Sequence, residues 1–559
     1  MIGLNKIGLN QVQLNRLHLN APFPTCRKMA GGGGSGDGFP VLPGDVTRWH
    51  FGGLTNEMMA AMDDPRIEDA DHKGRFLSFK NFAWKEGSGI SDVYPGALVF
   101  DGVDDCGVCE NFPILTKEKG YTVVALRQWD QDFLNTTLTG GLLSTRNYST
   151  GEGVAFEKIE SSNKGYWNLG AGGIIDFAKS PFTWQTSKQY NNVGILKGDK
   201  NHGKPLCVGC GLSGGQQCGR FAIWELVFLD HDATEEELTK IKDYFVKTYP
   251  WLFPNQAWTV TGKTNEDEDR ATIANITGNG NDLILSNFGF AEGSGYGLYA
   301  YNFNSFNLKD NVVKPTDVKK DSFRIIGTGN NSNVLVLSNT SNSADWKIRI
   351  TGMKEGDRCL IGNANKSGEY ISVNKDGTYT FQKQYAATST NGIWYNSSQE
   401  VDVLVEQIPE YEGYLVTDGV DDKIVSSSFG MGNDWTVIGD WELINTGKND
   451  NAGIVKFNSI VIYNYNPILI NIKNGRNNLI PDQNTVNAIC SDGRIYSKDW
   501  KESIYNEETE STSKNLLTIG YSGNNYTKIA FRNLAIYPTV LSKEDCIKAY
   551  NYLQTLKAK

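Results

Sequence analysis

Two stretches of sequence, VFDGVDD at residues 99–105 and VTDGVDD at residues 416–422, decide the fold of this chain. In each, apolar and β-branched residues run into an Asp-Gly pair, which is a strong turn signal after a strand. The recurrence of a strand and its turn, far apart in one chain, predicts two copies of the same β-module.

Two further motifs repeat in the same order ahead of these turns. The pattern Trp-x-x-x-Gly-x-Thr-Asn-Glu occurs at 49–57 and 258–266, and Asn-Phe-x-x-x-Glu-Gly-Ser-Gly occurs at 81–89 and 287–295. Three matches in one order are not chance, so the chain contains an internal duplication.

Each copy closes on an apolar strand, a turn and the start of a helix. Thr234 and Ser542 are candidate N-caps, because Glu237 and Asp545 follow three positions later as in a capping box. The two copies therefore end with the same strand–turn–helix pattern.

The second copy carries an insertion. Asn81 and Asp101 are 20 residues apart, whereas the matching Asn287 and Asp418 are 131 apart. The difference of about 111 residues is enough for one small domain, which we place at residues 298–410.

The insertion has its own strand signals. Alternating apolar and polar residues at 346–353 and 369–382 predict strands. The range 369–382 is predicted to form a hairpin of two strands around the turn Lys375-Asp376-Gly377. We expect a small β-sandwich.

Composition agrees with a β-rich chain and excludes some partners. The chain has 559 residues, 60 of them Gly, with 54 basic and 64 acidic residues and a net charge of −10. Without a basic stripe, neither nucleic acid nor an anionic membrane is expected as the main partner. No apolar run reaches the roughly 20 residues that span a bilayer, and no signal-peptide core is evident.

The first twenty residues repeat every five positions. Four pentads follow one another, each with Leu at its third position and Asn at its fourth; the leucines are Leu4, Leu9, Leu14 and Leu19. A period of five matches neither a helix nor a strand, and four pentads are too few to bury a face on their own. We interpret the segment as an anchor that packs on sister chains or another protein, with a disordered tail as the alternative.

These observations divide the chain into an all-β, multi-domain arrangement. The predicted parts are an anchor (1–29), a Gly-rich linker (30–38), a first module with its leading segment (39–254), the leading segment of the second module (255–297), an inserted β-sandwich (298–410) and the second module (411–559).

The modules resemble laminin-G-like, concanavalin A-like jelly rolls. The opening strand, the Asp-Gly turn, GYTVVALRQW at 120–129 and DWTVIGDWELI at 434–444, and the closing strands with their helix starts carry this resemblance. It implies two curved antiparallel sheets per module, a fold that serves lectins, glycosidases, adhesins and virion spikes.

The joined arrangement resembles virion proteins of tailed bacteriophages that infect gut Bacteroidetes, the crAss-like group among them. The pentads, the Gly-rich tether and the repeated motifs carry this resemblance. It implies a head-fibre or tail-fibre component, assembled in the host cytoplasm and located in the virion. Its expected partners are other virion proteins through the N-terminus, host surface glycans, and further copies of itself, in a trimer for example.

The cysteines leave three interpretations open. Cys106, Cys109, Cys207 and Cys210 form two C-x-x-C units, a common tetrahedral zinc arrangement, with Cys218 nearby. Matching LSG at 212–214 with YSG at 521–523 puts Cys210 opposite Ile519, a core position. Buried thiols are then expected, and disulfides are the third possibility.

Two further candidate sites concern ligands. The Asp residues of the DGVDD turns could supply oxygen ligands to Ca²⁺, or they could simply form polar turns. Tyr166 and Trp167 could stack on a sugar ring if they face solvent, or they could belong to the core.

No acidic triplet at alternate strand positions, as jelly-roll glycosidases require, occurs in the chain. The nearest acids, Glu266, Glu268, Glu508 and Glu510, lie in polar, loop-like sequence. We therefore expect a non-enzymatic display protein that needs no cofactor. The alternatives are a secreted or surface glycan-binding or glycan-degrading protein of a gut bacterium, and a decoration protein without a ligand.

Overall fold

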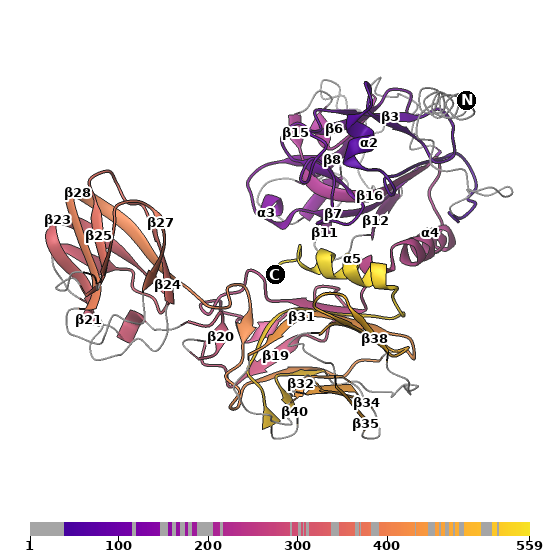
Figure 1. Ribbon diagram of the computed structural model, residues 1–559. Helices are drawn as coiled ribbons and strands as arrows, with labels where there is room; N and C mark the ends of the chain where they lie inside the picture. Colours follow the sequence, from indigo (N-terminus) through magenta and orange to yellow (C-terminus); the bar gives the residue numbers. More distant parts are fainter. Residues whose placement is uncertain are drawn as a thin grey trace, which may run out of the picture. The chain divides into compact units, whose positions relative to one another are not determined.

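The computed structural model shows an all-β chain with few helices (Figure 1). It describes residues 38–558 except for a set of loops, the longest being 146–154, 187–204, 337–345, 382–390, 445–452 and 505–516. The anchor residues Leu4, Leu9, Leu14 and Leu19 therefore lie outside the described residues. Within them, no helix is both long enough and apolar enough to cross a membrane.

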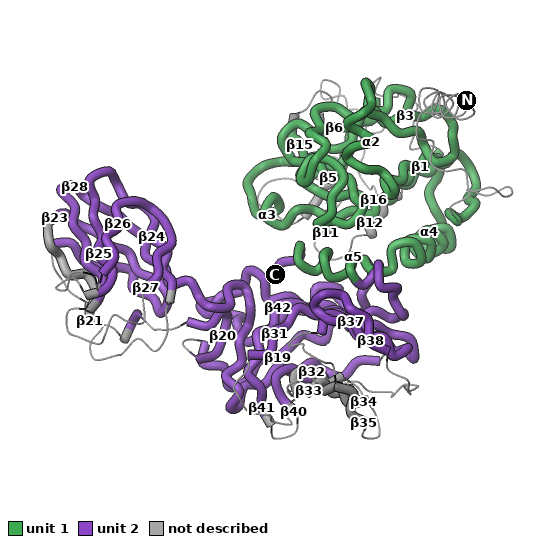
Figure 2. Tube along the Cα trace, in the orientation of Figure 1, with its two compact units in different colours: residues 1–253, 547–555 green, residues 254–546, 556–559 purple. Residues whose placement is uncertain are grey.

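The chain forms two compact units (Figure 2). Unit 1 comprises residues 1–253 and 547–555, and unit 2 comprises residues 254–546 and 556–559.

Unit 1 contains a six-stranded antiparallel sheet and a ten-stranded sheet, antiparallel except for the pair β15 and β8, and the two share one hydrophobic core. The first sheet runs β12 (Phe182–Thr186), β7 (Thr122–Trp129), β16 (Arg220–Leu229), β5 (Leu98–Asp101), β4 (Gly89–Ile90), with β1 (Val46–His50) on the far half of β16. The second runs β11 (Ile174–Asp176), β10 (Lys164–Trp167), β9 (Ala155–Lys158), β8 (Gly140–Ser144), β13 (Leu206–Val208), β6 (Cys106–Cys109), β3 (Phe76–Lys80), β2 (Arg66–Glu68), with the hairpin β14 (Cys210–Leu212) and β15 (Gln216–Cys218).

Unit 2 contains two sheets of the same kind around a second core. One runs β36 (Val486–Cys490), β31 (Thr436–Leu443), β42 (Ile529–Tyr537), β29 (Leu415–Val416), β20 (Gly295–Tyr296), with β17 (Gln256–Thr259) on β42 and with β37 (Arg494–Ser497) and β38 (Glu502–Ile504) beyond β36. The other runs β35 (Arg476–Leu479), β34 (Leu469–Ile472), β33 (Ile460–Tyr463), β32 (Gly453–Phe457), β39 (Thr518–Ile519), β30 (Lys423–Ser426), β19 (Leu283–Ser286), β18 (Thr272–Ile273), and the hairpin β40 (Tyr521–Ser522) and β41 (Asn525–Tyr526) lies apart.

The two modules share one strand order. Apart from the added strands β37 and β38, each strand of unit 1 has a counterpart in unit 2, and all but the hairpin β14–β15, whose counterpart β40–β41 is a separate two-stranded sheet, keep the same place in the corresponding sheet. The duplication seen in the sequence is therefore a duplication of topology. Trp49 and Trp258, which open the repeats, are both fully buried, and each indole N–H donates to a backbone carbonyl, of Arg75 and Asn281 respectively.

The strands of the insertion form a further eight-stranded sheet with a core of its own. Its members are β21 (Asn307–Leu308), β22 (Val313–Thr316), β23 (Ser322–Val336), β24 (Trp346–Thr351), β25 (Arg358–Asn363), β26 (Tyr370–Val373), β27 (Gly377–Phe381) and β28 (Asn391–Ile408).

The predicted hairpin at 369–382 is wrong in its pairing. The strand β26 pairs with β25, and β27 pairs with β24, so the turn at Lys375 and Asp376 separates two strands that have different partners. The long strand β28 pairs with β24 through one half and with β25 through the other. Alternation specifies a strand but not its partner, because both neighbours offer the same apolar face.

Both predicted helix starts are confirmed. Thr234 caps α4 (Glu235–Thr248) through a capping box with Glu237. Ser542 accepts the N–H of Asp545 at the start of α5 (Lys543–Leu553). Within the part of the chain that the structure describes, the other α-helices are the short α2 (Asn56–Ala60) and α3 (Gln131–Leu134).

Candidate functional site: the aspartate turns and the cysteines

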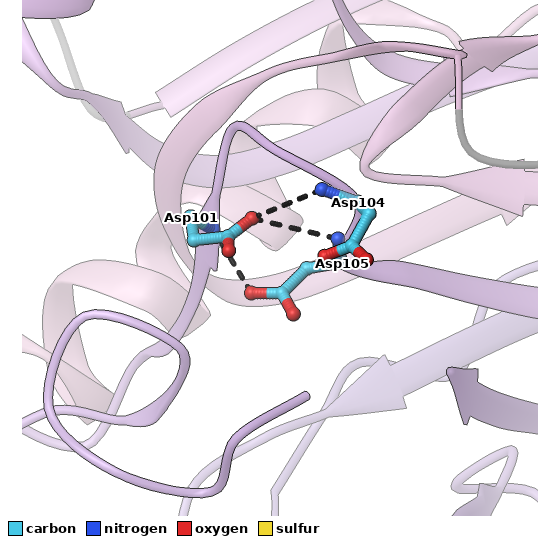
Figure 3. Close-up of side chains that lie close together, drawn as sticks. All are labelled: Asp101, Asp104 and Asp105. Carbon is cyan, nitrogen blue, oxygen red and sulfur yellow. Dashed lines mark hydrogen bonds between the residues drawn. The ribbon is translucent and has the colours of Figure 1, made fainter. Parts of the chain in front are cut away.

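The repeated DGVDD stretch is the turn that carries the chain from one sheet of a module to the other. In unit 1 it connects β5 to β6 (Figure 3). Asp101 Oδ1 accepts the backbone N–H groups of Val103 at 2.7 Å and Asp104 at 3.3 Å. Asp105 Oδ2 accepts the N–H of Asp101 at 3.0 Å, and Asp105 Oδ1 accepts the hydroxyl of Ser88 at 3.0 Å.

The turn of unit 2 repeats the bonds between the aspartates and the backbone. Asp418 Oδ1 accepts the N–H groups of Val420 at 2.7 Å and Asp421 at 3.3 Å, and Asp422 Oδ2 accepts the N–H of Asp418 at 2.7 Å. The carboxylates therefore satisfy backbone donors that a tight turn would otherwise leave unpaired.

One carboxyl of each turn is buried. Asp105 and Asp422 are 0% and 1% exposed. Burial raises the pKa of each carboxyl to about 7, against the opposing effect of the backbone hydrogen bonds.

In each turn, three carboxylate oxygens, one from each Asp, lie within 4.8 Å of one another. Ca²⁺ takes six to eight oxygen ligands. Because the first and last carboxylates of each turn already accept backbone N–H groups, the geometry accounts for these two without an ion, and calcium binding stays a prediction.

The other repeated motifs support this turn. Asn56 bonds both backbone groups of Ile90 at 2.8 and 2.7 Å, and Asn265 bonds those of Tyr296 at 2.8 and 3.1 Å. Gly89, with φ +147°, approaches Asn56 so closely that a Cβ atom would lie 2.3 Å from its Oδ1. Only glycine combines that conformation with that contact.

The Asn-Phe motif completes the arrangement. Asn81 and Asn287, both at positive φ, donate their side-chain N–H to the carbonyl oxygens of Asp104 and Asp421 at 3.1 and 3.0 Å. The residues that the two copies share thus form one hydrogen-bonded structural unit, which explains why they repeat.

The cysteines do not form the predicted set. In β6, Cys109 faces the core, and burial raises the pKa of its thiol to about 12. Cys106 belongs to a separate buried cluster with Cys207, Cys210 and Cys218. A disulfide joins Cys210 to Cys218, which corrects the expectation of a buried free thiol at Cys210. Residues three positions apart in a strand point to opposite faces of the sheet, so Cys106 and Cys109 cannot bind the same metal ion.

Sequence reasoning missed a buried charge network in unit 1. The carboxylate of Glu225 accepts hydrogen bonds from Arg48, Tyr244 and Tyr249 at 3.0 Å each and contacts His50. Burial raises the pKa of Tyr249 well above its ordinary value. The network links β1, β16 and α4. The one signal of it in the sequence is Glu225 itself, a charged residue inside an otherwise apolar strand, because a buried charge needs partners.

The remaining candidates are placed as follows. Tyr166 and Trp167 belong to β10, which pairs with β9 and β11, and their side chains lie outside the described residues. Glu266 and Glu268 are exposed and lie outside the strands, whereas Glu508 and Glu510 are not among the described residues.

No protein-family model matches the chain, and no curated protein matches it. Among solved structures, the LG1–3 region of the laminin alpha2 chain is 12% identical, with 77% of this chain and 95% of that chain covered and a TM-score of 0.17.

Two others are the tandem CBM22-1-CBM22-2 domain of Paenibacillus barcinonensis Xyn10C (10% identical, 44% and 100% covered, TM-score 0.14) and a chain of Sulfolobus Turreted Icosahedral Virus (9% identical, 84% and 88% covered, TM-score 0.12). All three TM-scores are far below 0.5, so the fold assignment rests on the strand order of the chain itself.

Proposed function

We propose that this chain is a structural virion protein of a bacteriophage, a head-fibre or tail-fibre component that displays its two jelly rolls for attachment to host surface glycans. The N-terminal pentads bind the particle or sister chains, and the modules face outward. Multiple copies then convert weak sugar contacts into avidity.

One observation supports display rather than catalysis most directly. The first and last aspartates of the repeated turn accept hydrogen bonds from the backbone of that turn, in the same way in both units. A retaining glycosidase needs two free carboxyls about 5–5.5 Å apart across the scissile bond. Carboxylates bound to backbone N–H groups serve the fold instead.

The experiment is a comparison of the full chain with a variant carrying Glu266, Glu268, Glu508 and Glu510 changed to Gln. Both are incubated with capsular polysaccharides of gut Bacteroidetes, and binding and product formation are measured. We expect equal binding and no products. Defined oligosaccharides that disappear in the variant would establish a depolymerase.

The location in a particle is tested separately. Antibodies against unit 1 are used to image purified virions of the phage that encodes the chain. Labelled fibres support the proposal, and unlabelled particles contradict it.

One observation favours the second candidate, a secreted or surface glycan-binding protein. The Cys210–Cys218 disulfide is typical of an oxidising compartment. Recovery of the chain in the medium or on the surface of bacteria without particles would support this alternative.

A further inference from the structure

Four cysteines gather on one face of a sheet in unit 1. Cys106 (β6), Cys207 (β13), Cys210 (β14) and Cys218 (β15) are 4%, 1%, 0% and 5% exposed and form one cluster with Val108. The core cysteine of the same strand, Cys109, faces the opposite side. Three separate segments of the chain therefore bring four cysteines into one buried cluster.

The duplication identifies the same place in unit 2. Val208 pairs with Gly107 as Ile519 pairs with Ile424, so Ile519 corresponds to Val208, two positions from the match expected from the sequence. The glycines that follow, Gly209 and Gly520, both have positive φ.

The hairpins then align directly. Cys210 faces Cys218 in β14–β15 as Tyr521 faces Tyr526 in β40–β41. By the same register, Cys106 corresponds to Lys423, the first residue after the aspartate turn.

Unit 2 fills this place with large side chains and a positive charge. The rings of Tyr521 and Tyr526 stack at 6.0 Å, and the Lys423 ammonium lies 5.8 and 5.9 Å from their centres. A cation held by two aromatic faces is stabilised electrostatically. In unit 1, three cysteines with much smaller side chains occupy the corresponding positions.

Close contacts hold the segments that carry these cysteines. Cys207 Sγ accepts the backbone N–H of Cys210, and the turn between them needs Gly209, whose φ is +95°. Lys80 lies opposite Cys106 on the neighbouring strand.

We propose that in the reduced chain Cys106, Cys207, Cys210 and Cys218 bind one Zn²⁺, a structural metal that takes the place of the lysine and tyrosines of unit 2. Four cysteine sulfurs in a buried, closed site are a common tetrahedral zinc arrangement. A dithiol reductant first transfers two electrons and two protons to the Cys210–Cys218 bond and becomes a disulfide itself. Zn²⁺ then replaces the protons of the thiols, which pass to solvent.

The test uses the full chain, produced in a bacterial cytoplasm with added zinc and purified with a reductant. Metal analysis is expected to give about one Zn²⁺ per chain. Alkylation after denaturation with a chelator is expected to modify all nine cysteines. A chain without zinc, or one in which two cysteines resist alkylation under these conditions, would overturn the proposal.

Single substitutions identify the ligands. Cys106→Ser, Cys207→Ser, Cys210→Ser and Cys218→Ser should each reduce bound zinc below about a tenth of the wild-type value. Cys109→Ser is the matched control, because Cys109 lies in the same strand as Cys106 but faces the hydrophobic core of unit 1. This variant should bind as much zinc as the wild type. Loss of zinc in Cys109→Ser would refute the ligand set.

A measurement on the wild-type chain tests the proposal even if the cysteine variants do not fold. Removal of zinc by a chelator should lower the unfolding temperature of unit 1 and leave that of unit 2 unchanged. Equal unfolding temperatures of unit 1 with and without the chelator would contradict a structural metal.

Discussion

The buried carboxyl of Asp105 allows a direct test of the structural role of the aspartate turns. We consider Asp105→Asn, which keeps the size of the side chain but cannot ionise. Asp104→Asn is the matched control, because Asp104 is exposed in the same turn and loses the same charge.

The magnitude follows from the raised pKa. Burial raises the pKa of Asp105 from 3.8 to about 7, so the folded state holds the proton more tightly than the unfolded state. This carboxyl therefore contributes its full stability below about pH 4 and loses it as the pH rises towards 7. At about 1.4 kcal/mol per pH unit the loss is at most about 4 kcal/mol, and water reaching the turn reduces it to about 2–4 kcal/mol.

The assay is urea unfolding between pH 4.5 and pH 8.5, followed by tryptophan fluorescence, for the wild type and both variants. Near pH 4.5 Asp105→Asn should match the wild type within about 1 kcal/mol, and at pH 8 it should be more stable by about 2–4 kcal/mol. Asp104→Asn should show no such change with pH. A variant less stable than the wild type at pH 8 would refute the reasoning.

The same assay tests calcium. If Ca²⁺ binds this turn, it should stabilise unit 1 of the wild type at pH 8 and not unit 1 of Asp105→Asn. Equal unfolding curves with and without Ca²⁺ would assign the three carboxylates to the turn alone.

Three further predictions concern the architecture. Deletion of residues 1–29 should leave a folded protein that no longer joins its particle, and normal incorporation in virions would contradict the anchor. A fragment of residues 298–410 should unfold cooperatively in urea, because its sheet has a core of its own, and a non-cooperative transition would count against an independent domain. Gly295→Ala should cost about 2–4 kcal/mol of unfolding free energy, because a Cβ would lie 2.5 Å from Asn265 Oδ1, whereas Gly293→Ala, with open space around it, should cost about 1 kcal/mol; equal costs would be inconsistent with the contact.

Much of the fold could be predicted from local patterns. The Asp-Gly turns, the caps at Thr234 and Ser542 and the arithmetic that locates the insertion depend on neighbouring residues, and those neighbours are read directly from the chain. The shared strand order of the modules follows from the duplication, since similar sequences fold alike.

The candidate sites could be predicted only in part. The spacing of Cys106 and Cys109 suggested a common site, but a strand sends them to opposite faces, and the sequence carried no signal that Cys218 joins Cys106 instead. The match of Cys210 with Ile519 missed by two positions, because a short motif fixes a register less firmly than a ladder of hydrogen bonds does.

The sequence alone determined that the chain is β-rich, duplicated and interrupted by an insertion, because periodicity, turn residues and spacing are local or additive properties. Only the tertiary structure decided which strands pair, that the shared acids bond to their own backbone, and which four cysteines meet. Those outcomes depend on contacts between residues as far apart as Cys106 and Cys218, and long-range register is set by the packing of whole sheets rather than by any single segment.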